Sequence, residues 1–144
     1  MSRLALAFDC KEGLIACEEK ALVLANIFEC DKKNIFFAST GVIGEKLPYK
    51  KIIPHFHYLK KNLSSSGLKA ASNAILTTDL KAKIYTSKFK ICNEFFTISG
   101  FAKGSGMIFP NMATMLAFIF TDFAIDRKTL SSFTKKAVDE SFNR

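Results

Sequence analysis

The sequence lacks a long uninterrupted apolar run. Its longest apolar stretch, at 112–125, is broken by Thr114, Thr121 and Asp122. A helix that crosses a bilayer needs about 20 consecutive, mostly apolar residues. We therefore expect a soluble protein that does not act in or on a membrane.

The sequence also lacks the spacings of common metal and nucleophile sites. Its four cysteines include no C-x-x-C pair and no histidine at zinc spacing. The two histidines, His55 and His57, have no carboxylate or cysteine nearby, which favours surface residues over metal ligands. No Ser-His-Asp catalytic triad can be recognised in the sequence. The sequence predicts no metal site, and reduced thiols in a cytoplasmic protein.

Arginine is scarce, although the chain is basic. Lysine and arginine total 21 against 13 acidic residues, for a net charge of +8, but the arginines are only Arg3, Arg127 and Arg144. The lysines occur as scattered pairs without a dense block. Readout of bases and phosphates favours arginine, so this distribution argues against a nucleic-acid partner. A single well-placed lysine would serve a small anionic substrate.

The chain has enough apolar residues for a folded core. Hydrophobic residues make up 49% of the sequence, including 15 phenylalanines, and the length suits one domain over residues 1–144. SSSG at 64–67 is too short for a domain linker. Periodicity predicts mixed elements without a regular βαβ alternation, which favours a layered α+β fold. The predicted elements are a helix at 12–28, a buried strand at 34–38, a basic helix at 49–62 interrupted at Pro54, a helix at 68–75, strands at 83–91, 95–99 and 115–120, and a helix at 127–142 capped by Asp126.

Three loops combine hydroxyl groups with glycine or acidic residues. They are Ser39-Thr40-Gly41, Thr77-Thr78-Asp79 and the stretch 103–114, KGSGMIFPNMAT. Hydroxyls beside glycine can offer donors to a developing oxyanion. The third loop lacks the full G-x-x-x-x-G-K-[ST] spacing of a phosphate loop. Taken singly, each loop is equally compatible with ordinary turn chemistry.

Together these loops resemble the motifs of the ornithine acetyltransferase family, also called glutamate N-acetyltransferase. The resemblance rests on ASTGVIGEKLP (38–48), AILTTDLKAK (74–83), KGSGMIFPNMATML (103–116) and AVDESFNR (137–144), in this order. It covers about residues 12–144. It implies an α+β fold of the layered α/β/β/α sandwich type.

The resemblance implies a self-cleaving precursor. Family members cleave between the Ala and Thr of the third motif, here Ala113 and Thr114. Thr114 would then be the catalytic nucleophile, with its own freed α-amine as the base. The implied reaction moves the acetyl group of N-acetylornithine to glutamate through an acetyl-threonine intermediate, in arginine biosynthesis. No cofactor is implied, and whether acetyl-CoA also donates acetyl stays open.

The resemblance also assigns roles in binding and oxyanion stabilisation. Thr40 and Gly41 match the oxyanion-hole pair, and Thr77 and Lys103 match substrate-binding positions beside Thr114. Thr78 is an alternative to Thr77. For Lys103, the alternative is a solvated loop lysine.

The family pattern extends beyond both ends of this chain. Of the family's opening segment, only the stretch from Cys10 to Leu14 resembles this chain, and the family sequence continues after SFN. We therefore expect an incomplete fold, with an α-chain part at 1–113 and the start of a β chain at 114–144, from a family whose intact members form α2β2 heterotetramers. Two alternatives stay open: an inactive remnant or a piece that needs a separately encoded partner, and a related N-terminal-nucleophile amidohydrolase.

Overall fold

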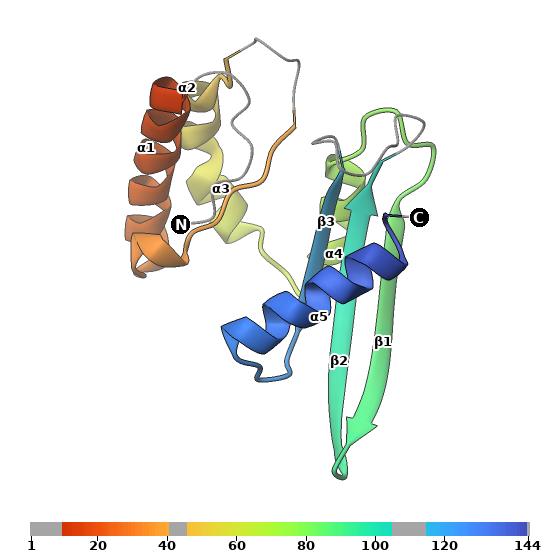
Figure 1. Ribbon diagram of the computed structural model, residues 1–144. Coiled ribbons are helices and arrows are strands. Elements are labelled where there is room, and N and C mark those ends of the chain that lie inside the picture. Colours follow the sequence, from red (N-terminus) through yellow and green to blue (C-terminus); the bar gives the residue numbers. More distant parts are fainter. Residues whose placement is uncertain (1–9, 41–45, 105–114, 144) are drawn as a thin grey trace. The chain divides into compact units, whose positions relative to one another are not determined.

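The computed structural model describes residues 10–40, 46–104 and 115–143 (Figure 1). Its contacts divide the chain into two compact units, Met1–Ser65 and Ser66–Arg144. The division falls inside the stretch 64–67, which we expected to be too short for a domain linker. That residues 1–144 form one domain stays a prediction.

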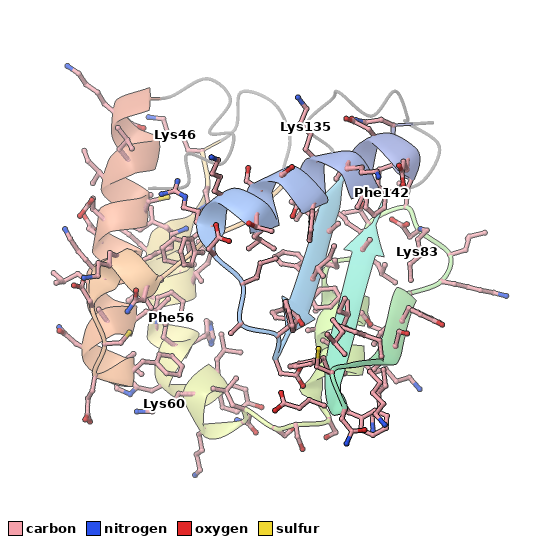
Figure 2. All side chains as sticks on the ribbon, turned by 60° about the horizontal axis from the view of Figure 1, so that its bottom comes forward. Lys46, Phe56, Lys60, Lys83, Lys135 and Phe142 are labelled. Atoms are coloured by element: carbon pink, nitrogen blue, oxygen red, sulfur yellow. The ribbon has the colours of Figure 1, made fainter. Side chains whose placement is uncertain are left out.

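The first unit is built from helices. They are α1 (Cys10–Phe28), η1 (Lys32–Asn34), α2 (Tyr49–Ile52), η2 (Ile53–His55) and α3 (Phe56–Lys61). Helices α1 and α3 pack together, and Phe56 of α3 is buried along with Ala21 and Ala25 of α1. The Lys60 ammonium donates to the Ile27 carbonyl near the C-terminus of α1, where a cation is favourable (Figure 2). The predicted helices at 12–28 and 49–62 are confirmed, including the interruption at Pro54.

The predicted strand at 34–38 is wrong. Asn34 ends η1, and residues 35–38 have no regular secondary structure. Phe36 is 71% exposed. A buried strand needs neighbours for its backbone N–H and C=O groups, and the described residues of the first unit contain no other strand. A short apolar run does not reveal whether such neighbours exist.

The second unit contains a three-stranded antiparallel sheet. Strands β1 (Lys83–Ile91), β2 (Glu94–Lys103) and β3 (Leu116–Thr121) lie in the order β1-β2-β3. Cys92 and Asn93 connect β1 to β2 with φ values of 46° and 73°. Positive φ at both positions is what a two-residue type I′ hairpin requires. Helices α4 (Gly67–Ala74) and α5 (Arg127–Glu140) lie on opposite sides of this sheet in Figure 1.

The two faces of the sheet carry different aromatic groups. On one face Phe101 stacks on Phe118, with ring centroids 5.0 Å apart, and Phe101 is buried. On the other face Phe96 meets Phe123 edge to face at 4.7 Å, beside Phe89. Such pairs stabilise a sheet beyond simple burial, by about 0.5–1.5 kcal/mol each.

The remaining predicted elements are confirmed, with one strand longer than expected. The sequence predicted 95–99 as the second strand, but β2 continues through Gly100 to Lys103. A Cβ at Gly100 would lie 2.9 Å from the Phe118 carbonyl oxygen, so glycine permits this pairing. Helix α5 begins as predicted, because the Asp126 carboxylate accepts from the Lys128 and Thr129 N–H groups. Among the described residues, no helix is long and apolar enough to cross a membrane.

Candidate active site

The structure brings the second and third sequence motifs together. Asp79, in the bend between α4 and β1, accepts hydrogen bonds from the N–H of Gly104, with its two carboxylate oxygens 3.0 and 3.3 Å from that nitrogen. Gly104 directly follows Lys103, the last residue of β2. The TTD loop is therefore attached to the end of β2 that carries the predicted substrate anchor.

Lys83 completes this attachment from the first position of β1. Its ammonium forms an ion pair with the Asp79 carboxylate and donates to the Gly104 carbonyl oxygen at 3.0 Å. Figure 2 shows Lys83 near the arrowhead that marks the end of β2. Asp79 and Lys83 thus bind the N–H and the C=O of one residue. We call this pair the Asp79–Lys83 clamp.

The charge of Asp79 is well stabilised. Its side chain is only 1% exposed, whereas that of Lys83 is 52% exposed. The hydrogen bond from Lys83 and then the bond from the Gly104 N–H hold the pKa of Asp79 below its usual value. The clamp therefore contains an ionised carboxylate at neutral pH.

Gly104 has a conformation that other residues rarely adopt. Its φ is +152°, and a Cβ there would lie 3.2 Å from Cγ of Met115. Met115 is therefore in close contact with Gly104. The two residues flank the stretch 105–114, and the clamp holds one of them directly.

Lys103 is buried, which excludes the alternative of a solvated loop lysine. It is only 4% exposed, at the end of β2, opposite Leu116 in the β2–β3 register. Its burial and its place in a strand distinguish it from the surface lysines of the chain. Burying an ammonium is costly unless polar or anionic groups surround it.

The other predicted site residues are distributed over the chain. Thr77 and Thr78 both lie exposed in the bend just before Asp79, which leaves the choice between them open. Thr40 is half-buried in the first unit. Gly41, Ala113 and Thr114 lie outside the described residues, so their roles stay predictions.

Sequence reasoning missed Asp79 and Lys83 as site residues. Both residues lie in the motif AILTTDLKAK (74–83), but the sequence assigned no role to Asp79 beyond the Thr77-Thr78-Asp79 turn or to Lys83 beyond the start of a strand. The available signal was the spacing of an acidic and a basic residue four apart in DLKAK. That signal was weak because such pairs are common on surfaces, where they contribute little.

The described residues show no metal centre. Within 10–40, 46–104 and 115–143, no group of three or more His, Cys, Asp or Glu side chains could hold a metal ion. The thiols of Cys17, Cys30 and Cys92 are free.

The fold is an incomplete α+β arrangement in which two of the sequence motifs converge at the end of one strand. The family profile that matches it, over residues 1–144, is that of the ArgJ family, and the chain belongs to this family. This confirms the resemblance inferred from the motifs.

Individual relatives agree with this assignment. The chain is 38% identical over 133 residues to the arginine biosynthesis bifunctional protein ArgJ of Caldanaerobacter subterraneus, covering 92% of this chain and 33% of that protein. It is 40% identical over 136 residues to the protein of the same name from Gluconobacter oxydans, covering 94% and 32%. The chain thus spans about a third of the length of these curated relatives.

A solved structure supports the fold. The crystal structure of an arginine biosynthesis bifunctional protein ArgJ from Bacillus halodurans matches with a TM-score of 0.59 at 33% identity. The match covers 72% of this chain and 53% of that chain. The α+β class predicted from the sequence is confirmed.

Proposed function

We propose that this chain is the part of a glutamate N-acetyltransferase that generates the threonine nucleophile and anchors the substrate. The observation that carries the proposal is the buried Lys103, joined through Gly104 to the TTD loop. Family membership supplies the reaction class. Under this proposal the chain acts in the cytoplasm on small amino-acid derivatives.

The first step is self-cleavage between Ala113 and Thr114. The Thr114 hydroxyl oxygen attacks the Ala113 carbonyl carbon, the peptide C–N bond breaks, and the hydroxyl proton ends on the freed amine. Water then hydrolyses the resulting ester, releasing the Ala113 carboxylate and restoring the hydroxyl. Glycines and Pro110 around this bond suit the bent backbone that such an attack requires.

The second step is acetyl transfer. A free α-amine has an unperturbed pKa of about 7.7–8.0, so a sizeable neutral fraction is available to accept the hydroxyl proton. Thr114 attacks the acetyl carbonyl of N-acetylornithine, and ornithine leaves with that proton on its amine. The glutamate amine then attacks the acetyl-threonine ester, which forms N-acetylglutamate and regenerates the hydroxyl.

Hydrogen-bond donors named by the family resemblance would stabilise the oxyanion and hold the substrate. The proposed oxyanion hole consists of Thr40 and Gly41, where loss of one donor typically costs about 10²–10³ in rate. Lys103 would pair with the substrate's α-carboxylate, and Thr77 would donate a hydrogen bond beside it. The proposal includes no bound cofactor, and chains 1–113 and 114–144 would remain associated, as in an α2β2 assembly of the family type.

Mass spectrometry of the purified chain tests the first step. We expect two species, residues 1–113 and 114–144, from the wild type, one intact species from Thr114→Ala, and slower cleavage from Thr114→Ser. An intact wild-type chain after prolonged incubation would contradict the proposal. Supplying N-acetylornithine or acetyl-CoA with glutamate then identifies the acetyl donor.

A further inference from the structure

We propose that Asp79 is a positioning residue for self-cleavage, acting with Lys83 by holding the backbone of Gly104. This inference rests on the proposed function. Neither residue needs to touch the reacting atoms. The clamp fixes the backbone conformation of Gly104, which follows Lys103, and thereby the position of Met115, the residue that follows Thr114 in the chain.

The first support is that both peptide groups of Gly104 are bound. The N–H donates to Asp79, and the carbonyl accepts from Lys83 at 3.0 Å. Rotation of the backbone at Gly104 would break at least one of these bonds. A hydrogen bond donated to an ionised carboxylate is stronger than one between neutral groups, by about a factor of two. The clamp thus selects the unusual φ of +152°.

The second support is the place of the clamp in the sheet. The last paired residues of β2 and β3 are Lys103 and Leu116. Directly beyond them Gly104 and Met115 are in contact, so close that a Cβ added to Gly104 would lie 3.2 Å from Cγ of Met115. The ends of unpaired strands fray easily. By binding Gly104, the clamp keeps Gly104 and Met115, the residues that precede and follow the stretch 105–114, side by side.

The third support is the contrast with a second aspartate on the same sheet. Asp122 accepts from the Thr97 N–H at 2.8 Å, near the opposite end of β2. Asp122 is exposed, whereas the Asp79 side chain is almost fully buried and paired with a lysine. Asp122 therefore provides a matched control, since replacing it by asparagine weakens a comparable backbone bond far along the strand from Gly104.

The test compares self-cleavage rates of the full chain by mass spectrometry, with melting temperatures from circular dichroism. We expect Asp79→Asn to slow cleavage by about 10-fold to 100-fold, the range that small misplacements of reacting groups cause. Lys83→Met should slow it less, and Lys83→Arg should restore most of the rate. Asp122→Asn should cleave at the wild-type rate, even where it lowers the melting temperature. Lys81→Met, which removes an exposed lysine between α4 and β1, should also cleave at that rate.

Two results would overturn the inference. One is wild-type cleavage by Asp79→Asn. The other is a decrease in cleavage rate that is proportional to the decrease in melting temperature in both Asp79→Asn and Asp122→Asn. That result would indicate that Asp79 only stabilises the fold.

A second measurement separates this inference from the proposed function. In the Thr114→Ala background, hydrogen exchange of the Gly104 amide should accelerate at least about 10-fold on adding Asp79→Asn, because the buried acceptor of that amide is weakened. The Met115 methyl resonance should also shift. Unchanged exchange would overturn the clamp itself. An intact wild-type chain with a protected Gly104 amide would instead contradict the proposed function alone.

Discussion

The two ends of strand β2 are held in similar ways but surrounded by different chemistry. Near one end, Asp122 accepts from the Thr97 N–H. At the other, Asp79 accepts from the Gly104 N–H, and Lys83 binds the carbonyl of the same glycine. Each aspartate stabilises one end of the central strand by accepting a hydrogen bond from a backbone N–H.

The difference lies in what each end contains besides that bond. The Gly104 end combines a buried lysine, a nearly fully buried carboxylate and a glycine at φ +152°. Burial of the lysine carries a desolvation cost, and the backbone conformation at Gly104 is one that only glycine adopts readily. At the other end Asp122 is exposed, and Thr97 lies within the regular strand. The comparison teaches that a similar hydrogen bond can hold a strand at one place and support a site at another.

The largest effect is expected from Lys103→Met. Replacing the ammonium removes the proposed partner of the substrate carboxylate, and losing a buried charge-assisted bond should lower kcat/KM for acetyl transfer by about 100-fold. Self-cleavage should continue, because Lys103 has no part in the attack on Ala113. Transfer assays with Lys88→Met, at an exposed position of β1, provide the control. Equal loss in both variants would contradict the role of Lys103.

A pair of glycine substitutions separates stability from function. In Gly104→Ala, the alanine would have to adopt a positive φ and its Cβ would crowd Met115. In Gly100→Ala, the Cβ would lie 2.9 Å from the Phe118 carbonyl oxygen. We expect each to destabilise the fold by about 1–3 kcal/mol in chemical denaturation. Only Gly104→Ala should also slow self-cleavage, by about 10-fold. If Gly100→Ala slowed cleavage as much as Gly104→Ala, the special role assigned to the Gly104 end of β2 would be contradicted.

The smallest effect is a pH dependence of stability. The pKa of Asp79 is lowered by Lys83 and by the Gly104 N–H, so its carboxylate stabilises the folded state above the unfolded pKa of about 3.9. This contribution is lost as the pH falls through the lower folded pKa. Melting temperatures should therefore drop more steeply below about pH 4 in the wild type than in Asp79→Asn. Parallel curves would show that Asp79 contributes nothing through its charge.

Local sequence patterns were sufficient for most of the fold. Alternation marked β1 at 83–91, and the apolar spacing of 12–28 marked α1. The Asp126 cap was also readable, because capping depends on neighbours two and three residues away. The prediction of a strand at 34–38 was wrong because a strand depends on pairing partners that a local pattern does not show.

The site was only partly predictable for the same reason. Motif resemblance pointed to Lys103 and Thr77, but burial of Lys103 emerges only from the packing of the sheet. The clamp joins residues 25 positions apart, and although Asp79 and Lys83 both lie in the motif at 74–83, the motif does not show that they bind Gly104. Tertiary contacts of this kind cannot be read from composition, periodicity or short spacing.

The central claim is that the chain generates its own nucleophile, and N-terminal sequencing of the smaller fragment tests it most directly. After incubation of the purified wild-type chain, the account predicts a fragment that begins Thr-Met-Leu, at Thr114, and none from Thr114→Ala. An intact wild-type chain, or a fragment that begins at any other residue, would contradict it.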